Sequence, residues 1–338
     1  MRMAAFLRRL STDLDRFGID LSGAAVVAAV SGGADSLAML HGLVALDRRR
    51  RLGLRLTVAH FDHRLRPESA AEADLVARQA EALGLDSQVG SADVAGAARC
   101  GSIEQTARRL RYRWLGQVCR RTDSRFLAVA HHADYQAETI LHRICRGTSL
   151  RGLVGMAPRR PLDADGTVEV IRPLLGFRRS ELVALVESLG QTYCCDPSND
   201  RLDATRNRIR HQVLPLLDTA VHPGAASALV RLGQQAAAAQ RVVADAADAA
   251  RRHLDVRTDD GRTSLDAAAL TALPELIGGE VVRRLLADFG AGEARITAAH
   301  LQRVLRLAAA AHGRKTLHLP RGLRAARRGP RLMLWPER

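Results

Sequence analysis

The sequence predicts an α/β protein with a doubly wound parallel sheet, followed by a mainly helical part. Segments typical of strands and of helices alternate through residues 24–146, as they do in parallel sheets with crossover helices. The first strand candidate, 24–30, is apolar at every position, which indicates burial on both faces. From about residue 219 the alternation stops, and helical patterns of Ala, Leu and Arg follow.

The remaining elements follow from periodicity and from residues that end or begin a helix. A helix over 69–83 is closed by Gly84, and Ser102 with Gln105 predicts a capping box for the helix that follows. Residues 147–161 are predicted to form a basic loop. We expect two domains, 1–217 with an N-terminal helix over 1–20, and a helical, basic 218–338. Further elements are expected at 54–61, 87–94, 126–130 and 168–175 (strands), and at 102–121, 135–146, 180–189, 205–217, 224–252 and 265–312 (helices).

Composition indicates a polyanionic partner. The formal net charge is +15 and the pI is about 11.1, a balance typical of nucleic-acid-binding proteins. Five cysteines without C-x-x-C spacing argue against a disulfide framework, a zinc site and an iron–sulfur cluster. With no signal peptide and no apolar run long enough to span a membrane, we expect a cytoplasmic protein. The sequence leaves the oligomeric state open, a homodimer included.

The loop after the first strand carries the main chemical signal. Ser31-Gly32-Gly33 ends the strand, and Asp35-Ser36 opens a helix. Paired glycines permit close approach of a ligand, and the N–H groups of the helix start favour phosphate. The loop is neither a Walker A motif nor a Rossmann fingerprint, and a turn that only packs is the alternative.

Polar side chains at the strand ends are candidates for the rest of a ligand site. Asp35 is either a Mg²⁺ ligand beside phosphates or a simple helix cap. His60 and His132 follow strands without nearby thiolates, so we expect them to face substrate and not zinc. Arg108 and Arg111 share one helix face, where they either clamp a phosphate or form a solvated basic surface.

A second pair of carboxylates lies on another helix. Asp134 and Glu138 are four residues apart, so both can face one pocket. Two carboxylates there could bind an ammonium group and later accept its proton. The alternative is that Asp134 caps the helix and Glu138 is exposed.

The phosphate loop resembles that of the PP-loop, or N-type, ATP pyrophosphatases, which split ATP between the α- and β-phosphates. Together with six further motifs in family order, it makes residues 24–217 similar to the tRNA(Ile)-lysidine synthetases. The motifs are Ser-Gly-Gly-Ala-Asp-Ser (31–36), Ala-His-Phe-Asp-His-Arg-Leu-Arg (59–66), Ser-Ile-Glu-Gln-Thr-Ala-Arg-Arg-Leu-Arg-Tyr (102–112), His-His-Ala-Asp-Tyr-Gln-Ala-Glu-Thr (131–139), Arg-Gly-Thr-Ser-Leu-Arg-Gly-Leu-Val-Gly-Met (146–156), Ile-Arg-Pro-Leu-Leu (171–175) and Asp-Pro-Ser-Asn with Arg-Asn-Arg-Ile-Arg (196–210).

This resemblance implies a PP-loop (adenine nucleotide alpha hydrolase-like) domain and a two-step reaction with ATP and Mg²⁺. The C2 oxygen of the wobble cytidine in a CAU-anticodon tRNA(Ile) is adenylated, and the ε-amine of free lysine then displaces AMP. The residues it assigns are Ser31, Gly32, Gly33, Ala34, Asp35, Ser36, His60 and Arg108 for ATP, Asp35 for Mg²⁺, Asp35, Arg111 and His132 for catalysis, Asp134 and Glu138 for lysine, and Arg206, Arg208, Arg210, Arg324 and Arg327 for tRNA.

One position departs from the family pattern. Two consecutive acids are usual in the 131–139 motif, but Tyr135 stands at the second position here. Either the two remaining carboxylates are sufficient to bind lysine, or the lysine site is rebuilt or weakened. The alternatives are another PP-loop tRNA-modifying enzyme, such as a cytidine thiolase, and a tRNA-binding paralogue with impaired catalysis.

Overall fold

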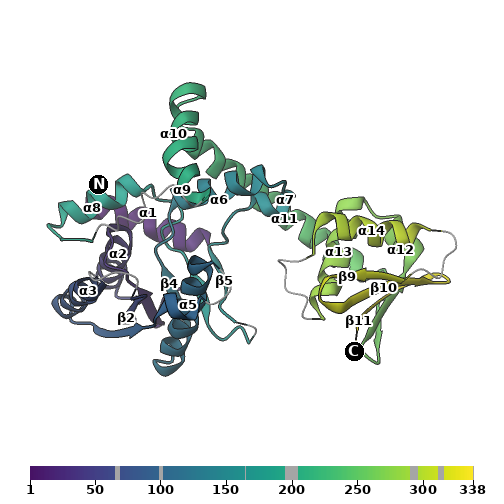
Figure 1. Ribbon diagram of the computed structural model, residues 1–338, viewed down its shortest axis with the longest axis horizontal. Coiled ribbons are helices and arrows are strands. Elements are labelled where there is room, and N and C mark those ends of the chain that lie inside the picture. Colours follow the sequence, from purple (N-terminus) through teal and green to yellow (C-terminus); the bar gives the residue numbers. More distant parts are fainter. Residues whose placement is uncertain are drawn as a thin grey trace. The chain divides into compact units, whose positions relative to one another are not determined.

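The computed structural model describes residues 1–64, 69–98, 102–163, 165–194, 205–289, 296–310 and 316–337. The Asp-Pro-Ser-Asn motif at 196–199, Cys100, Cys195 and Lys315 lie outside these residues. The chain forms two units (Figure 1): unit 1 comprises 1–146 and 155–231, and unit 2 comprises 147–154 and 232–338. The units thus divide at residue 231, within a helix, whereas the sequence prediction places the boundary at 217.

Unit 1 contains the expected parallel sheet. Its six strands have the order β3-β2-β1-β4-β6-β5, and all neighbours are parallel except β5 and β6. The central strand β1 is buried along nearly its whole length, as its run of Ala and Val predicts. The strands are β1 (Ala25–Ala29), β2 (Arg55–Asp62), β3 (Asp86–Ser91), β4 (Phe126–Val129), β5 (Arg159–Pro161) and β6 (Glu169–Ile171).

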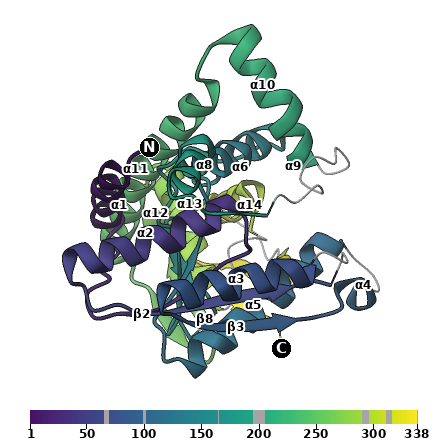
Figure 2. The ribbon, with the colours of Figure 1, turned by 90° about the vertical axis from the view of Figure 1, so that its left-hand side faces the viewer.

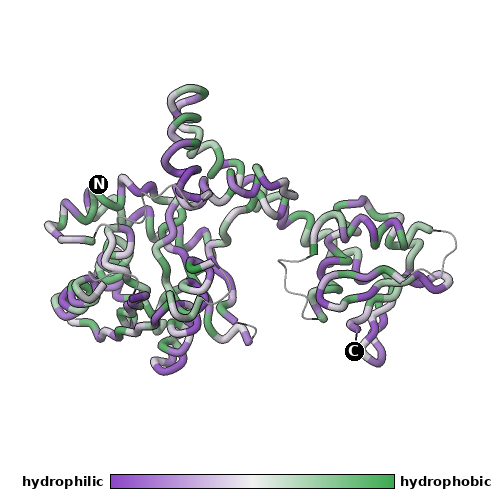
Figure 3. Tube along the Cα trace, viewed as in Figure 1, coloured by the Kyte–Doolittle hydropathy of each residue, from purple (hydrophilic) through white to green (hydrophobic). Residues whose placement is uncertain are grey.

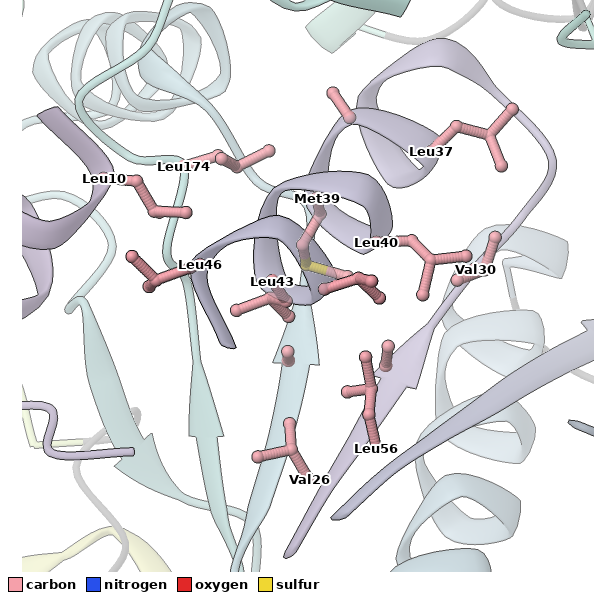
Figure 4. Close-up of a cluster of buried hydrophobic side chains, with 14 of the residues drawn as sticks. Leu10, Val26, Val30, Leu37, Met39, Leu40, Leu43, Leu46, Leu56 and Leu174 are labelled. Atoms are coloured by element: carbon pink, nitrogen blue, oxygen red, sulfur yellow. The ribbon is translucent and has the colours of Figure 1, made fainter. Parts of the chain in front are cut away.

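Helices cover both faces of this sheet. The larger core lies under α1, α2, α3 and α8, and Figure 4 shows Leu40, Leu43 and Met39 of α2 meeting Val26 and Leu56 of the sheet. A smaller core lies under α5, on the other face. Figure 2 shows α1 beside α2. The helices are α1 (Met3–Arg16), α2 (Ala34–Arg50), α3 (Ser69–Leu83), α4 (Val94–Ala97), α5 (Ile103–Arg121), α6 (Ala133–Cys145) and α8 (Arg179–Ser188).

The segment that begins at Thr205 is helical, as predicted, but it continues past residue 217. The segments α9 (Thr205–Arg208), η2 (Ile209–Val213), α10 (Leu214–Leu216) and η3 (Leu217–Val221) follow one another, and η2 and η3 are π-helical. They precede α11 (Ala225–Arg251), which matches the helix predicted over 224–252. In both views α10 extends away from the sheet (Figures 1 and 2).

Three local predictions need correction. Ser102 is the N-cap residue of α5, but its side chain makes no capping hydrogen bond. The helix predicted over 180–189 begins one residue earlier, because Arg178 is the N-cap residue of α8, and its N–H donates to Glu181 Oε2 at 2.7 Å. The segment 147–161 is not an irregular loop, because it contains α7 (Leu150–Leu153) and β5.

Unit 2 contains a sheet that the sequence prediction missed. Five antiparallel strands have the order β7-β8-β11-β10-β9, and helices from the same unit share its core. The expected helices within 265–312 are present, but the basic tail after 316 pairs into strands. The elements are α12 (Ala267–Thr271), α13 (Glu275–Ala287), α14 (Ala298–Ala309), β7 (Arg257–Asp259), β8 (Arg262–Asp266), β9 (Thr316–Leu319), η4 (Pro320–Gly322), β10 (Leu323–Arg328) and β11 (Arg331–Pro336).

Hydrophobic and hydrophilic stretches alternate along the helices of both units (Figure 3), as expected for helices with one buried face. Within the residues that the structure describes, no single helix is long and apolar enough to cross a membrane. The helical stretch Thr205–Val221 and α11 meet the length and hydropathy criteria only together, and they are bent by 101° at their junction.

Candidate active site

The phosphate loop is built as a tight turn between β1 and α2. Gly32 has φ +86°, a conformation that favours glycine, and its carbonyl accepts a hydrogen bond from Cys194 N at 2.9 Å. Ser36 Oγ donates to the Gly33 carbonyl at 2.8 Å and accepts from Ser31 N at 3.2 Å. These bonds hold the loop in place, so its remaining N–H groups and the start of α2 have a geometry that suits a phosphate.

Asp35 and His132 face each other across the point where the strand order reverses. Asp35 follows β1, His132 follows β4, and the sheet extends in opposite directions from these two neighbouring strands. Asp35 Oδ2 lies 3.4 Å from His132 Nε2. Open α/β sheets bind ligands at this place, beyond the carboxyl ends of the strands. The geometry therefore puts the phosphate loop and His132 in one site.

His132 lies between two carboxylates. Its side chain is 2% exposed, and its Nδ1 lies 3.3 Å from Asp134 Oδ2. Burial disfavours the imidazolium, but Asp134 and Asp35 outweigh burial and raise the pKa of His132. The opposite Asp35 oxygen, Oδ1, is buried and has no hydrogen-bond partner among the described residues. Asp35 thus has one oxygen available for a cation.

Asp134 holds the start of α8 to the site. It accepts a hydrogen bond from Arg179 N at 2.7 Å, and its Oδ1 lies 2.9 Å from Arg178 Nη2. Burial opposes ionisation of Asp134, yet His132, the Arg179 N–H and Arg178 together lower its pKa. The carboxylate expected to bind lysine is therefore ionised and already paired.

Glu138 is paired as well. Its side chain is 1% exposed, and Arg210 binds it in a bidentate manner, with Nε–Oε1 2.6 Å and Nη2–Oε2 3.0 Å. Arg206 Nε lies 3.8 Å from Oε2, and its Nη2 donates to Thr139 Oγ1 at 3.0 Å. Residues expected at a lysine site and at a tRNA surface thus form one cluster around the buried Glu138 carboxylate. Arg208 is exposed, and its Nη2 donates to Thr205 Oγ1 at 3.3 Å.

A guanidinium cluster lies beside His131, and it is larger than the predicted pair of arginines. Arg108, Arg111 and Arg160 lie over the ring of Tyr112, with each Cζ 4.9–5.4 Å from the ring centroid. Burial opposes ionisation of Tyr112, but the surrounding guanidinium charges together lower its pKa. Concentrated, partly desolvated positive charge of this kind favours a polyanionic ligand.

Arg172 connects this cluster to the site. It is 3% exposed, its Nε donates to His131 Nδ1 at 3.0 Å, and burial lowers its pKa to about 10. Arg111 is half-buried, desolvation of its guanidinium lowers its pKa, and its Nε has no hydrogen-bond partner in the described parts of the chain. The sequence prediction gave Arg172 no role, although the residue lies within the Ile-Arg-Pro-Leu-Leu motif at 171–175.

Other predicted residues have supporting contacts. His60 is buried, and its Nδ1 lies 2.9 Å from the Val30 carbonyl, so it braces the strand that leads into the loop. In unit 2, Arg324 pairs with Glu337, and Arg327 Nη1 donates to the Ala308 carbonyl at 2.7 Å. No group of three or more His, Cys, Asp or Glu side chains within the described parts of the chain is arranged to hold a metal ion.

Two family models match the chain. A PP-loop domain model matches residues 7–217, and a model of the TilS substrate binding domain matches residues 265–332. The chain is 35% identical over 310 residues to a tRNA(Ile)-lysidine synthase of Thermobifida fusca, covering 92% of this chain and 90% of that protein. The chain belongs to the tRNA(Ile)-lysidine synthase family. Its residues 7–217 match the PP-loop domain that the sequence predicts.

Some relatives in the lysidine synthase family are longer. The chain is 32% identical over 310 residues to the tRNA(Ile)-lysidine synthase of Geobacillus kaustophilus, covering 90% of this chain and 65% of that protein. The chain thus spans about two thirds of the length of this relative. Among solved structures, a tRNA thiolase, NcsA, from Methanococcus maripaludis has TM-score 0.57 and 20% identity, covering 69% of this chain and 77% of that one. This likeness concerns the fold alone.

Proposed function

We propose that this chain ligates lysine to the wobble cytidine (position 34) of a CAU-anticodon tRNA(Ile), with ATP as the energy source. The observation that carries this proposal is the Asp35–His132 pair beside the phosphate loop, at the strand-order reversal of a chain in the lysidine synthase family. The products are lysidine in the tRNA, AMP and pyrophosphate. This modification changes codon recognition from AUG to AUA.

The first step transfers adenylate to the tRNA base. The C2 oxygen attacks the α-phosphate, an oxygen–phosphorus bond forms, and pyrophosphate leaves. Ser31–Ser36 would hold the leaving pyrophosphate, and Arg111 with Arg108 would offset negative charge at the α-phosphate. Asp35 suits Mg²⁺, because this ion commonly takes one or two carboxylates plus substrate phosphates. Bound there, Mg²⁺ would neutralise phosphate charge.

The second step joins the amine to the base. The lysine ε-nitrogen bonds to C2, the bond from C2 to the adenylate oxygen breaks, and the nitrogen loses a proton. Asp134 and Glu138 lie on α6 at the edge of the site, so we assign them to the lysine ammonium group. Since both are paired with arginine, lysine would have to share or replace Arg178 or Arg210. His132 would orient Asp35 and help to carry the released proton.

The tRNA would contact basic side chains of both units. Phosphate contacts supply affinity without sequence information, so cytidine choice would come from a base unstacked into the site. Of the assigned arginines, Arg208 is exposed and suits phosphate contact directly. Arg206 and Arg210 would act mainly by holding Glu138.

The decisive experiment identifies the nucleoside that is made. Wild-type protein is incubated with ATP, Mg²⁺, lysine and a CAU-anticodon tRNA(Ile) transcript, and the digested tRNA is analysed by mass spectrometry. We expect a cytidine derivative heavier by one lysine minus water, and AMP release that requires both lysine and tRNA. AMP release independent of lysine would contradict the lysine assignment, and incorporation of sulfur from a sulfur donor would indicate a thiolase.

A substitution of Asp35 tests the metal assignment within the same assay. Asp35→Asn keeps the shape but removes the charge, and we expect turnover to fall by a factor on the order of 100. Asp74→Asn, an exposed change on α3, is the matched control and should keep wild-type turnover. Unchanged turnover and Mg²⁺ dependence in Asp35→Asn would refute the role. A wild-type protein that binds tRNA without releasing AMP would indicate an impaired paralogue.

A further inference from the structure

Tyr135 lies at the meeting point of three side-chain clusters, yet the proposed reaction gives it no role. It is in the first turn of α6, next to Asp134. Its ring centroid is 4.2 Å from that of His132, with an interplanar angle of 39°, and 5.8 Å from that of His131, at 84°. The Arg210 guanidinium carbon lies 4.9 Å from the same ring centroid.

Each of these three partners belongs to a different part of the site. His132 lies between Asp35 and Asp134, Arg210 binds Glu138, and His131 accepts a hydrogen bond from Arg172. Among the described side chains, the ring of Tyr135 contacts His131, His132 and Arg210. A displacement of Tyr135 would therefore reach the phosphate loop, the acid on α6 and the guanidinium cluster together.

A neutral aromatic side chain suits this position better than a carboxylate would in this chain. Arg210 already neutralises Glu138, and a second acid within reach of Arg210 would compete with Glu138 for the same guanidinium. The ring instead attracts the guanidinium through its π face while leaving both Glu138 bonds intact. Burial keeps the phenol uncharged, because it raises the pKa of Tyr135 and outweighs Arg210.

We propose that Tyr135 is a positioning residue: its ring fixes the His132 imidazole against Asp35 and holds the Arg210 guanidinium on Glu138. The proposal rests on the proposed lysine transfer only for its kinetic consequence. The ring contacts themselves are independent of that reaction. The aromatic ring makes the contacts with His132 and His131, and a hydrogen bond of the Tyr135 side chain adds to the ring's contact with Arg210.

Three substitutions separate the ring from the hydroxyl group and from packing. Tyr135→Phe keeps the ring, Tyr135→Leu replaces it with a smaller apolar side chain, and Tyr135→Asp adds the acid. Phe17→Leu, at the C-cap of α1 and packed against the large core, is the matched loss of an aromatic ring elsewhere in unit 1. We expect lysidine formation in Tyr135→Leu to fall by roughly 10- to 100-fold, because His132 and Arg210 lose their orientation.

The kinetic pattern distinguishes positioning from folding. In Tyr135→Leu we expect kcat to fall, and KM for lysine to rise, with the affinity for tRNA unchanged. Tyr135→Phe should stay within about threefold of wild type, whereas Tyr135→Asp should resemble Tyr135→Leu. Equal activity of all variants would overturn the proposal. A loss of activity in Tyr135→Leu that is fully explained by a smaller folded fraction would also overturn it. Phe17→Leu shows how much activity is lost when an aromatic ring is removed elsewhere in unit 1.

A spectroscopic measurement keeps the test valid if the protein makes no lysidine. In NMR spectra of protein labelled at histidine and arginine, the ring current of Tyr135 shifts the His132 ring protons and the Arg210 side chain. Tyr135→Phe should retain these shifts, and Tyr135→Leu should lose them while Arg331, which pairs with Asp255 in unit 2, keeps its signals. Retained shifts in Tyr135→Leu would refute the contacts. An absent product with lost shifts would refute only the proposed reaction.

Discussion

Arg210 contributes to the stability of the fold as well as to the candidate site, because it neutralises Glu138, whose side chain is 1% exposed. Removal of one partner of a buried ion pair leaves the other charge uncompensated, at a cost of about 3–5 kcal/mol. We therefore expect Arg210→Ala to lower the free energy of unfolding of unit 1 by an amount of that order, measured by urea denaturation.

The exposed Arg208, two residues earlier, is the matched control. Arg208→Ala should change the free energy of unfolding by no more than about 0.5 kcal/mol. The double variant Glu138→Gln with Arg210→Met should recover much of the loss, because it removes both charges. Equal stability of Arg210→Ala and Arg208→Ala would mean that Glu138 does not depend on this pair.

His63 makes stability depend on pH. Burial, helped by the nearby Arg111, lowers the pKa of His63 to about 4, below its ordinary value of 6.5. Above pH 6.5 the ring is neutral in both states, and between pH 6.5 and 4 the unfolded chain binds the proton first. Stability is therefore lost as pH falls through this range.

The measurement is the urea midpoint from pH 7.5 to pH 5 for wild type and His63→Gln. We expect a smaller fall with pH in the variant, with a remaining part from His131, whose pKa burial and Arg172 also lower. An unchanged pH dependence in His63→Gln would contradict the assignment. His41→Gln should have a smaller effect, because a hydrogen bond to Gln79 partly offsets burial there.

At the scale of elements, α1 and α2 approach closely at one glycine. A Cβ added at Gly42 would lie 2.5 Å from Phe6 Cε1, so the ring and the helix backbone touch directly. Alanine gains up to about 1 kcal/mol over glycine within a helix, whereas overpacking costs about 1–3 kcal/mol. We expect Gly42→Ala to destabilise unit 1 in thermal unfolding.

Gly279 of α13 provides the opposite case. A Cβ there would meet nothing within 4 Å, so Gly279→Ala should stabilise unit 2 by about 0.5–1 kcal/mol. The two alanine substitutions should therefore shift the melting temperature in opposite directions. A stabilising Gly42→Ala would show that Phe6 can move aside at little cost.

The elements of unit 1 were predictable because their signals are local. The apolar run of β1, the glycine pair of the loop and the glycine after α3 each mark an element where it occurs. The sheet of unit 2 was not predictable in this way, because the arginine-rich sequences of β10 and β11 indicated a basic tail and not strands. Buried alternate positions, such as Ala325 and Leu334, pair with each other between β10 and β11, and Leu334 also pairs with Thr263 of the distant β8.

The candidate site, too, was only partly predictable from the sequence. The loop, Asp35 and His132 were predictable, since all lie at strand ends. The partners of Asp134 and Glu138 were not, because Arg178 and Arg210 come from segments after the sheet. The residue spacing that favoured an ammonium site put both acids on one helix, and it contained no information about the arginines that bind them.

At the scale of the whole molecule, the charge of +15 predicts strongly salt-dependent RNA binding. We expect the logarithm of the tRNA affinity to fall linearly with the logarithm of salt concentration. Arg328 is exposed on β10, so Arg328→Ala should reduce the slope by about 0.7–0.9 if it contacts a phosphate. Fluorescence anisotropy with labelled tRNA at several salt concentrations measures the slope.

Its neighbour Arg327 serves as the comparison. Arg327 donates to the Ala308 carbonyl at the end of α14. Compared with Arg328→Ala, Arg327→Ala should therefore lower the stability of unit 2 more and change the salt dependence of tRNA binding less. The reverse order, with Arg327 controlling the slope and Arg328 the stability, would place the tRNA contact on the other side of β10.

The short helix α7 has a consequence for how such proteins can be recombined. Residues 147–154 belong to unit 2, although unit 1 precedes and follows them in the chain. Arg151 lies 3.9 Å from Glu280 of α13 within unit 2, while Gln136 of α6 holds Met156 in unit 1 through bonds of 2.7 and 3.1 Å. A single crossover near residue 231 between two related genes would therefore combine residues 232–338 of one protein with the α7 of the other. A functional exchange of this unit requires two grafts made together.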